Sequence, residues 1–89
     1  MATMPLTGRE RDLFVQAREY IASGRLPSAV PKSLGAGHGT GATCCLCGQR
    51  IEPEQVEYEL REEGGETFHF HMQCHAIWQL AAVDQISRG

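Results

Sequence analysis

Two short cysteine and histidine motifs constrain the fold of this 89-residue chain more than any other feature. Cys44 and Cys47 have C-x2-C spacing, and His71 and Cys74, which follow at a distance, have H-x2-C spacing. Zinc prefers four thiolate or imidazole ligands in a tetrahedron, and two thiolates two residues apart on a tight turn reach one ion at ~2.3 Å. Gly48 permits such a turn and frees backbone amides to point at the thiolates. We therefore predict one Zn²⁺ per chain, bound by Cys44, Cys47, His71 and Cys74.

The second motif lies where we expect a helix to begin. Positions i and i+3 share a helix face, so His71 and Cys74 meet the same ion if both lie at the start of that helix. The helix N-terminus also stabilises a thiolate at Cys74. Four protein ligands leave no coordination position for water or substrate. We therefore predict a structural metal site and no enzymatic activity.

The length of the chain makes such support necessary. A chain of this size buries only about 60 to 65% of its unfolded surface, so its core is marginal without a metal, a disulfide or a partner. No stretch reaches the ~20 apolar residues of a membrane span, and residues 1–10 lack the apolar segment of a secretory signal. We expect a cytoplasmic protein without a membrane partner, whose reduced, clustered cysteines bind metal.

The N-terminal part of the chain predicts a helix followed by a tether. Thr7 and Glu10 form a capping box and Gly24 is a stop signal, which predicts an amphipathic helix over residues 8–23. Residues 35–43 read GAGHGTGAT, with four glycines in nine residues, as in a flexible tether. We therefore divide the chain into an N-terminal helical arm (1–34), a flexible glycine-rich linker (35–43) and a zinc-binding domain (44–89).

The predicted zinc-binding domain has the patterns of a hairpin and a helix. Val56, Tyr58 and Leu60 alternate with charged residues, as in a half-buried strand. A turn over residues 63–66 and a second alternating segment over residues 67–71 predict a β-hairpin. Residues 72–87 contain no glycine or proline and predict the second helix. The fold class is therefore a small zinc-stabilised α+β domain.

The sequence CLCG, the hairpin and FHMQC at a helix start together resemble the treble-clef zinc fingers. The closest resemblance is to the first zinc module of a LIM domain, which has C-x2-C, a spacer of similar length and then H-x2-C. It covers residues 44 to about 80 and implies a zinc knuckle, a β-hairpin and a helix around one zinc. A LIM domain continues with a second zinc module, but Ile77 and Leu80 stand where its first cysteines belong. The resemblance therefore implies a single-site treble clef, without the partner specificity of LIM domains.

Four further cysteine and histidine residues lie outside the predicted ligand set. Cys45 can replace Cys44 only with C-x-C spacing, which fits a knuckle poorly, so we interpret Cys45 as a spare thiol. His69 lies near the metal as a hydrogen-bond donor or else on the surface. His75 is interpreted as the partner of an acidic side chain, and His38 as a solvated linker residue.

The charge distribution bears on the kind of partner. The net charge is −3, and seven of the eleven acidic residues fall within residues 52–66. Such an acidic hairpin repels a phosphate backbone. A nucleic-acid-binding finger that uses the basic N-terminal arm is therefore an alternative function rather than the leading one. A thiol redox protein, acting through Cys44, Cys45 and Cys47, is a second alternative if the chain binds no zinc.

The second helix is apolar on several sides, and this suggests an interaction. A helix that is apolar most of the way round must be covered on more than one face. The hairpin covers one face, and either the N-terminal helix or a second protein chain covers another. The leading hypothesis is a small zinc-binding interaction or regulatory module, with a protein partner or a homodimer formed through this helix. The apolar residues that make up these sides include Met72, Ile77, Trp78, Leu80, Ala81, Ala82, Val83 and Ile86.

Overall fold

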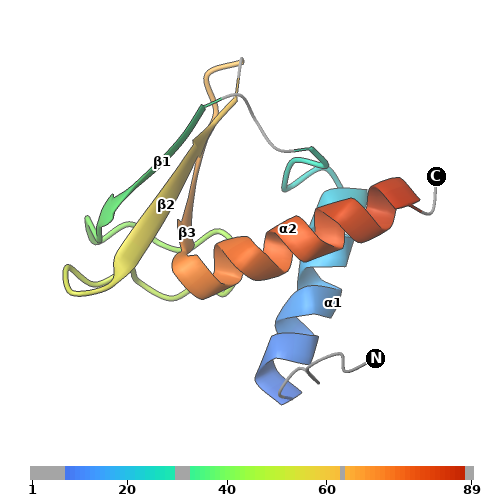
Figure 1. The fold of residues 1–89 in the computed structure, drawn as a ribbon, viewed down its shortest axis with the longest axis horizontal. Coiled ribbons are helices and arrows are strands. Elements are labelled where there is room, and N and C mark those ends of the chain that lie inside the picture. The colour runs from blue at the N-terminus through green and yellow to red at the C-terminus, as the bar shows by residue number, and fades with distance from the viewer. Residues whose placement is uncertain (1–7, 30–32, 63, 88–89) are drawn as a thin grey trace.

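The structure, a computed structural model, describes residues 8–29, 33–62 and 64–87. In chain order it contains α1 (Gly8–Ala22), β1 (Ser33–His38), β2 (Val56–Arg61), β3 (Thr67–His71) and α2 (Met72–Ser87). The strands form one antiparallel sheet in the order β1-β2-β3. Helix α2 begins at the end of β3 and runs from the sheet to α1, which crosses it (Figure 1). The predicted α+β class is therefore confirmed.

Both helices agree with the sequence patterns. Helix α1 ends one residue before the predicted boundary, and α2 has the predicted bounds. Gly24 has a φ of 82°, a left-handed conformation that glycine adopts without strain, and the amide of Arg25 bonds back to the carbonyl of Tyr20 at 2.8 Å. The predicted stop at Gly24 is therefore confirmed. The predicted capping residue Thr7 lies outside the described residues.

The glycine-rich segment differs from its prediction. Residues 33–38 form β1, in which Gly35 pairs with Glu59 and Gly37 pairs with Glu57, so the flexible linker predicted over residues 35–43 is wrong for residues 35–38. The exposed edge of β2 offers this segment a ladder of backbone hydrogen bonds, and glycine composition does not reveal that partner. The division of the chain into an N-terminal arm and a separate domain over residues 44–89 stays a prediction.

The loop after β1 is also fixed by its glycines. The amide of Gly39 donates to the carbonyl oxygen of Gln55 at 2.9 Å, and that of Gly41 donates to the carbonyl oxygen of Ile51 at 3.0 Å. A Cβ atom on Gly39 would lie 1.9 Å from the carbonyl oxygen of Glu52. Only glycine therefore fits at position 39, and the loop lies close against the segment that precedes β2.

The predicted hairpin is present as β2 and β3, and it has two unlike faces. Tyr58 pairs with Phe70 and Leu60 pairs with Phe68, so these side chains share the face that packs toward α2. The opposite face carries the acidic and histidine side chains that alternate with them. Val56, expected to be half-buried, is exposed because it begins the strand at the edge of the core.

Helix α1 packs against α2 and completes the core. Ala17, Ile21 and Leu26 from the N-terminal part of the chain are buried together with Trp78, which is fully buried. The indole Nε1–H of Trp78 donates to the carbonyl oxygen of Pro27 at 2.9 Å. The N-terminal helix therefore folds back onto α2, which answers the question that the sequence left open. The rest of the core consists of Cys44, Leu46, Ile51, Leu60, Phe68, Phe70, Cys74, Ile77, Ala81 and Ala82.

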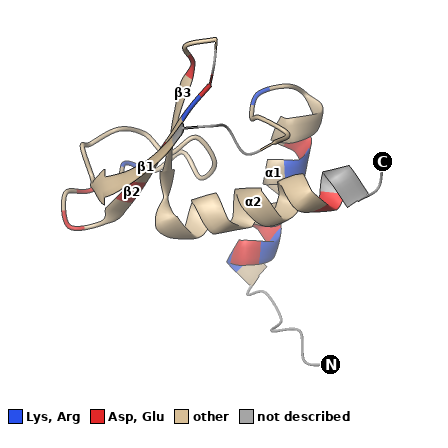
Figure 2. Cartoon of the chain, turned by 45° about the horizontal axis from the view of Figure 1, so that its top comes forward, with Lys and Arg blue, Asp and Glu red and all other residues tan. Residues whose placement is uncertain are grey.

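One side of α2 stays uncovered. Met72, Leu80 and Val83 each expose more than half of their surface. Asp84 is the only charged residue of α2, whereas α1 carries charges of both signs (Figure 2). Among the described residues, the helices lack the length and apolar character needed to cross a bilayer.

Candidate metal centre

A tight turn between β1 and β2 holds the first two predicted ligands. Thr43 and Arg50 form an isolated antiparallel bridge, and between them the amide of Cys44 donates to the carbonyl oxygen of Gln49 at 2.8 Å. Gly48 has a φ of 76°, and its amide donates to the carbonyl oxygen of Cys44 at 3.0 Å. This closed turn places the side chains of Cys44 and Cys47 on one side, as two metal ligands require.

The second pair comes from the junction of β3 and α2. His71 is the last residue of β3 and Cys74 lies in the first turn of α2, so the two do not share a helix face as expected. The strand-to-helix junction brings them together instead. The amide of Cys45 donates to the carbonyl oxygen of His69 at 2.8 Å, which holds the turn against β3.

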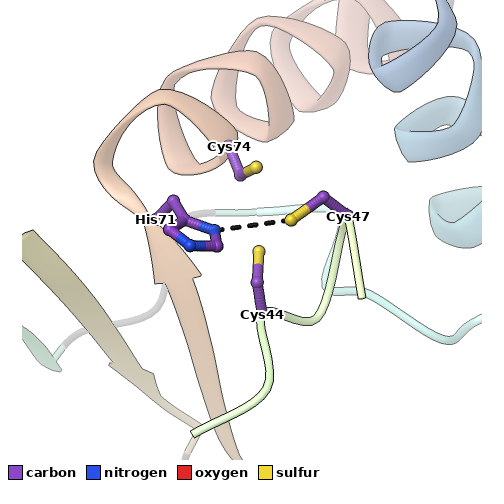
Figure 3. Close-up of side chains that lie close together, drawn as sticks. All are labelled: Cys44, Cys47, His71 and Cys74. Atoms are coloured by element: carbon purple, nitrogen blue, oxygen red, sulfur yellow. Dashed lines mark hydrogen bonds between the residues drawn. The ribbon is translucent and has the colours of Figure 1, made fainter. Parts of the chain in front are cut away.

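The structure brings all four predicted ligands into one cluster. The ligand atoms of Cys44, Cys47, His71 and Cys74 lie within 4.8 Å of one another, and their side chains converge on one point (Figure 3). Cys44 and Cys74 are buried, and Cys47 and His71 are half-buried. The chain therefore contains a Cys3His cluster able to hold a metal ion.

The separation of two donor atoms in the cluster is close to that expected for tetrahedral metal coordination. Cys47 Sγ lies 3.4 Å from His71 Nδ1. Zinc bonds of ~2.3 Å to sulfur and ~2.05 Å to nitrogen, at a tetrahedral angle, place these two atoms about 3.6 Å apart. The donor set also suits zinc, because soft thiolates together with imidazole select it over magnesium or calcium.

A hydrogen bond outside the cluster orients the imidazole. His71 Nε2 lies 3.2 Å from the carbonyl oxygen of Arg50. A carbonyl only accepts, so Nε2 carries the proton and Nδ1 presents its lone pair to the cluster. Metal-bound histidines commonly donate their second ring N–H in this way.

The thiols of the cluster are electrostatically coupled. The hydrogen bond from the Cys74 thiol lowers the pKa of Cys44 to about 4. Burial opposes this effect, and hydrogen bonds from the backbone of Cys47, His71 and Leu46 add to it. The same hydrogen bond and burial raise the pKa of Cys74. Burial raises the pKa of Cys47. A thiolate at Cys44 is thus favoured by its surroundings, and a bound cation would take the place of the protons on its neighbours.

Cys45 lies outside the cluster although it is adjacent to Cys44 in the sequence. Its side chain is half-buried against the core, and burial raises its pKa. The structure therefore agrees with the interpretation of Cys45 as a thiol separate from the four-residue set.

His69 binds an acidic side chain instead of approaching the metal cluster. Its Nδ1 lies 2.7 Å from Glu57 Oε2, and the amide and hydroxyl of Thr40 both donate to Glu57 Oε1 at 2.8 Å. Glu57 is only 5% exposed. Burial raises its pKa, but the hydrogen bonds from Thr40 and His69 outweigh this effect and lower the pKa below its ordinary value. Alternation along the strand predicted Glu57 on a solvated face, so this network could not be found from local sequence patterns.

Among the described residues His75 has no acidic partner, so its interpretation as the partner of an acid is wrong. The ring is buried and stacks on Tyr58 with a centroid distance of 4.5 Å, and Nε2 has no hydrogen-bond partner among the described residues. Burial lowers the pKa of His75. The side chain of His75, which follows Cys74, points toward the aromatic face of the sheet, so its ring packs in the core with Phe70 and Trp78.

Comparisons of the chain with protein-family models, curated protein sequences and solved structures give no match. The interpretation of the cluster therefore rests on its donor chemistry and geometry. Both are specific, because three thiols and one imidazole from two separate segments, the cysteine turn and the β3–α2 junction, lie within 4.8 Å of one another.

Proposed function

We propose that Cys44, Cys47, His71 and Cys74 bind one Zn²⁺ and that the chain is a single-site treble-clef finger. The observation that carries the proposal is the convergence of the four donor atoms within 4.8 Å. The order of elements supports it, since a turn with two cysteines precedes a hairpin and a helix that supply the other two donors. A treble-clef finger has the same order.

The role of the zinc in this proposal is structural. Four protein donors fill a tetrahedral shell, and burial of Cys44 and Cys74 keeps solvent from two of them. The Gln16 side chain of α1 donates to the carbonyl oxygen of Leu46, so α1 covers the cysteine turn. The metal would link that turn to the β3–α2 junction in a chain whose core is small. A non-enzymatic role follows for this site.

We extend the proposal to a protein-interaction role for α2. Packing of α1 leaves Met72, Leu80 and Val83 exposed along α2, and the neighbouring Asp84 is paired with Arg18 of α1 at 3.6 Å. Exposed apolar side chains grouped on one element are typical of protein-binding surfaces. The partner in this proposal is another protein chain, including a second copy of this one.

Cobalt substitution tests the metal part of the proposal. Co²⁺ added to metal-free chain should give the visible absorption bands of tetrahedral coordination and the near-ultraviolet band of thiolate ligation, and one equivalent of Zn²⁺ should remove both. Cys74→Ser should weaken the thiolate band, whereas Cys45→Ser should leave it unchanged. Absence of tetrahedral bands in the unaltered chain would refute the proposed site.

Site-specific crosslinking tests the interaction part. A photo-crosslinking residue at position 80 should yield a discrete crosslinked species in cells, whereas the same residue at position 15 should not. Val15 is the matched control because it is an exposed apolar residue of similar exposure, 49% against 55%, on α1. Equal crosslinking from both positions, or none from position 80, would count against a binding surface on α2.

A further inference from the structure

The sheet face opposite the aromatic core holds a second group of metal-ligating side chains. In the register of β2 and β3, Glu57 pairs with His71 and Glu59 pairs with His69, so all four side chains emerge on one face. His71 turns to the cysteines. The ligand atoms of Glu57, Glu59 and His69 remain and lie within 4.8 Å of one another.

We propose that Glu57, Glu59 and His69 form a second divalent-cation site, separate from the Cys3His cluster. Two carboxylates and one imidazole suit a divalent transition ion such as Mn²⁺ or Fe²⁺, whereas three thiolates suit zinc. The second site is therefore open to harder ions such as Mn²⁺ that the thiolate site binds poorly, although zinc in excess would also occupy it. Three protein ligands also leave coordination positions for water or a small anionic ligand.

Glu57 is oriented before any ion arrives. The amide and hydroxyl of Thr40 both bind Oε1, and this leaves Oε2 directed at His69 Nδ1, 2.7 Å away. The side chain is only 5% exposed, so these bonds hold the carboxylate in one position. Ligands fixed in this way lose little conformational freedom when they bind an ion.

The sheet face is open beside the two carboxylates. The β1 residues that pair with Glu57 and Glu59 are Gly37 and Gly35, so the neighbouring strand places no side chain over either carboxylate. A hollow of about 230 Å³ borders the two carboxylates on this side and is lined by both glycines, both glutamates, Thr40 and His38, while His69 is outside its lining. The hollow has room for an ion with bound water.

The existing contacts of the cluster are weak competitors. Glu59 accepts a hydrogen bond from Arg61 at 3.1 Å, but the Arg61 side chain is 63% exposed, and exposed ion pairs contribute little. His69 Nδ1 lies 2.7 Å from Glu57 Oε2, and a cation bound between these atoms would require the neutral imidazole to present the Nδ1 lone pair and carry its ring proton on Nε2. Neither contact blocks the hollow.

A manganese titration of the full chain, loaded with one equivalent of Zn²⁺ and no excess, tests the proposal. Free Mn²⁺ is measured by its electron paramagnetic resonance signal, and zinc retention is measured in the same sample. Mn²⁺ is a poor competitor for the thiolate site, because zinc lies far above it in affinity for such donors. We expect about one Mn²⁺ bound per chain, with zinc retained.

Paired variants locate the bound ion. Glu59→Gln should weaken Mn²⁺ binding at least tenfold, while Glu54→Gln, an exposed acid outside the cluster, should leave it unchanged. Circular dichroism and zinc content confirm that both variants fold. If Mn²⁺ does not bind, or if both variants lose affinity equally, Glu57 and His69 form only a structural hydrogen bond and the proposal is overturned.

The outcome is independent of the zinc proposal. A chain that binds no zinc but loses Mn²⁺ affinity on Glu59→Gln, and not on Cys47→Ser, would retain the second site and refute the first. A chain that binds zinc and no Mn²⁺ would retain the Cys3His site and refute the second site.

Discussion

The imidazole of His71 donates from Nε2 to the carbonyl oxygen of Arg50, 3.2 Å away, while its Nδ1 lies 3.4 Å from Cys47 Sγ. The ring thus joins the end of the cysteine turn to the cluster itself. Its orientation is set by backbone that belongs to the same turn as two of the other ligands. The site is therefore built as one unit, in which the turn supplies two thiols and positions the imidazole.

This relationship predicts which nitrogen of His71 binds zinc. In the zinc-loaded chain, long-range ¹H–¹⁵N correlation spectra should show His71 with a protonated Nε2 and a metal-bound Nδ1. His38, an exposed histidine, should show the pattern of a solvent-exposed ring and serves as the internal control. Protonation of Nδ1 in His71 would contradict the proposed ligation.

The two neighbouring cysteines should respond differently to substitution. Cys47→Ser should release the metal and unfold the region around the cluster, because structural zinc contributes on the order of 10 kcal/mol to folds of this kind. Cys45→Ser should retain zinc and change stability little, since Cys45 lies outside the cluster. Zinc content and the urea midpoint measure both effects. Equal zinc loss from the two variants would mean that the ligand set is wrong.

The hydrogen bond between Trp78 and Pro27 should contribute measurably to stability. Trp78→Phe leaves the carbonyl of Pro27 without its donor and reduces buried volume, so we expect a loss of about 2 to 4 kcal/mol in urea unfolding of the zinc-loaded chain. Leu80→Ala, at an exposed position of the same helix, is the control and should change stability by less than about 1 kcal/mol. Similar effects of the two substitutions would argue against docking of the N-terminal segment on α2.

Substitution of His75 should show the cost of its unpaired nitrogen. His75→Phe keeps a flat ring stacked on Tyr58 and removes the buried Nε2, so we expect stability to rise by about 1 kcal/mol. His75→Ala removes the ring and should lower stability by about 2 to 4 kcal/mol. Thermal unfolding at constant pH, with zinc bound, measures both. A marked loss of stability in His75→Phe would show that Nε2 has a required partner.

The elements with strong local signals could be predicted from the sequence. The pattern of apolar residues and the stop at Gly24 located α1, and alternation around a Gly-Gly turn located the hairpin. The spacing of Cys44, Cys47, His71 and Cys74 selected the residues that the structure brings together. These features depend on neighbours in the sequence, which is why single-sequence patterns reveal them.

The features that depend on distant neighbours could not be predicted. β1 forms because the edge of β2 accepts its backbone, and composition alone suggested a flexible segment. Glu57 is buried because Thr40 and His69 satisfy its carboxylate from two other segments. His75 lies in the core because the position after Cys74 turns toward the sheet. In each case the deciding partner is more than ten residues away in the sequence.

Native mass spectrometry of the chain purified without added metal tests the central claim most directly. The account predicts a folded species that carries one zinc ion, and the loss of that ion in Cys47→Ser and in Cys74→Ser. A folded chain that carries no metal and retains its structure in the presence of a strong chelator would contradict it.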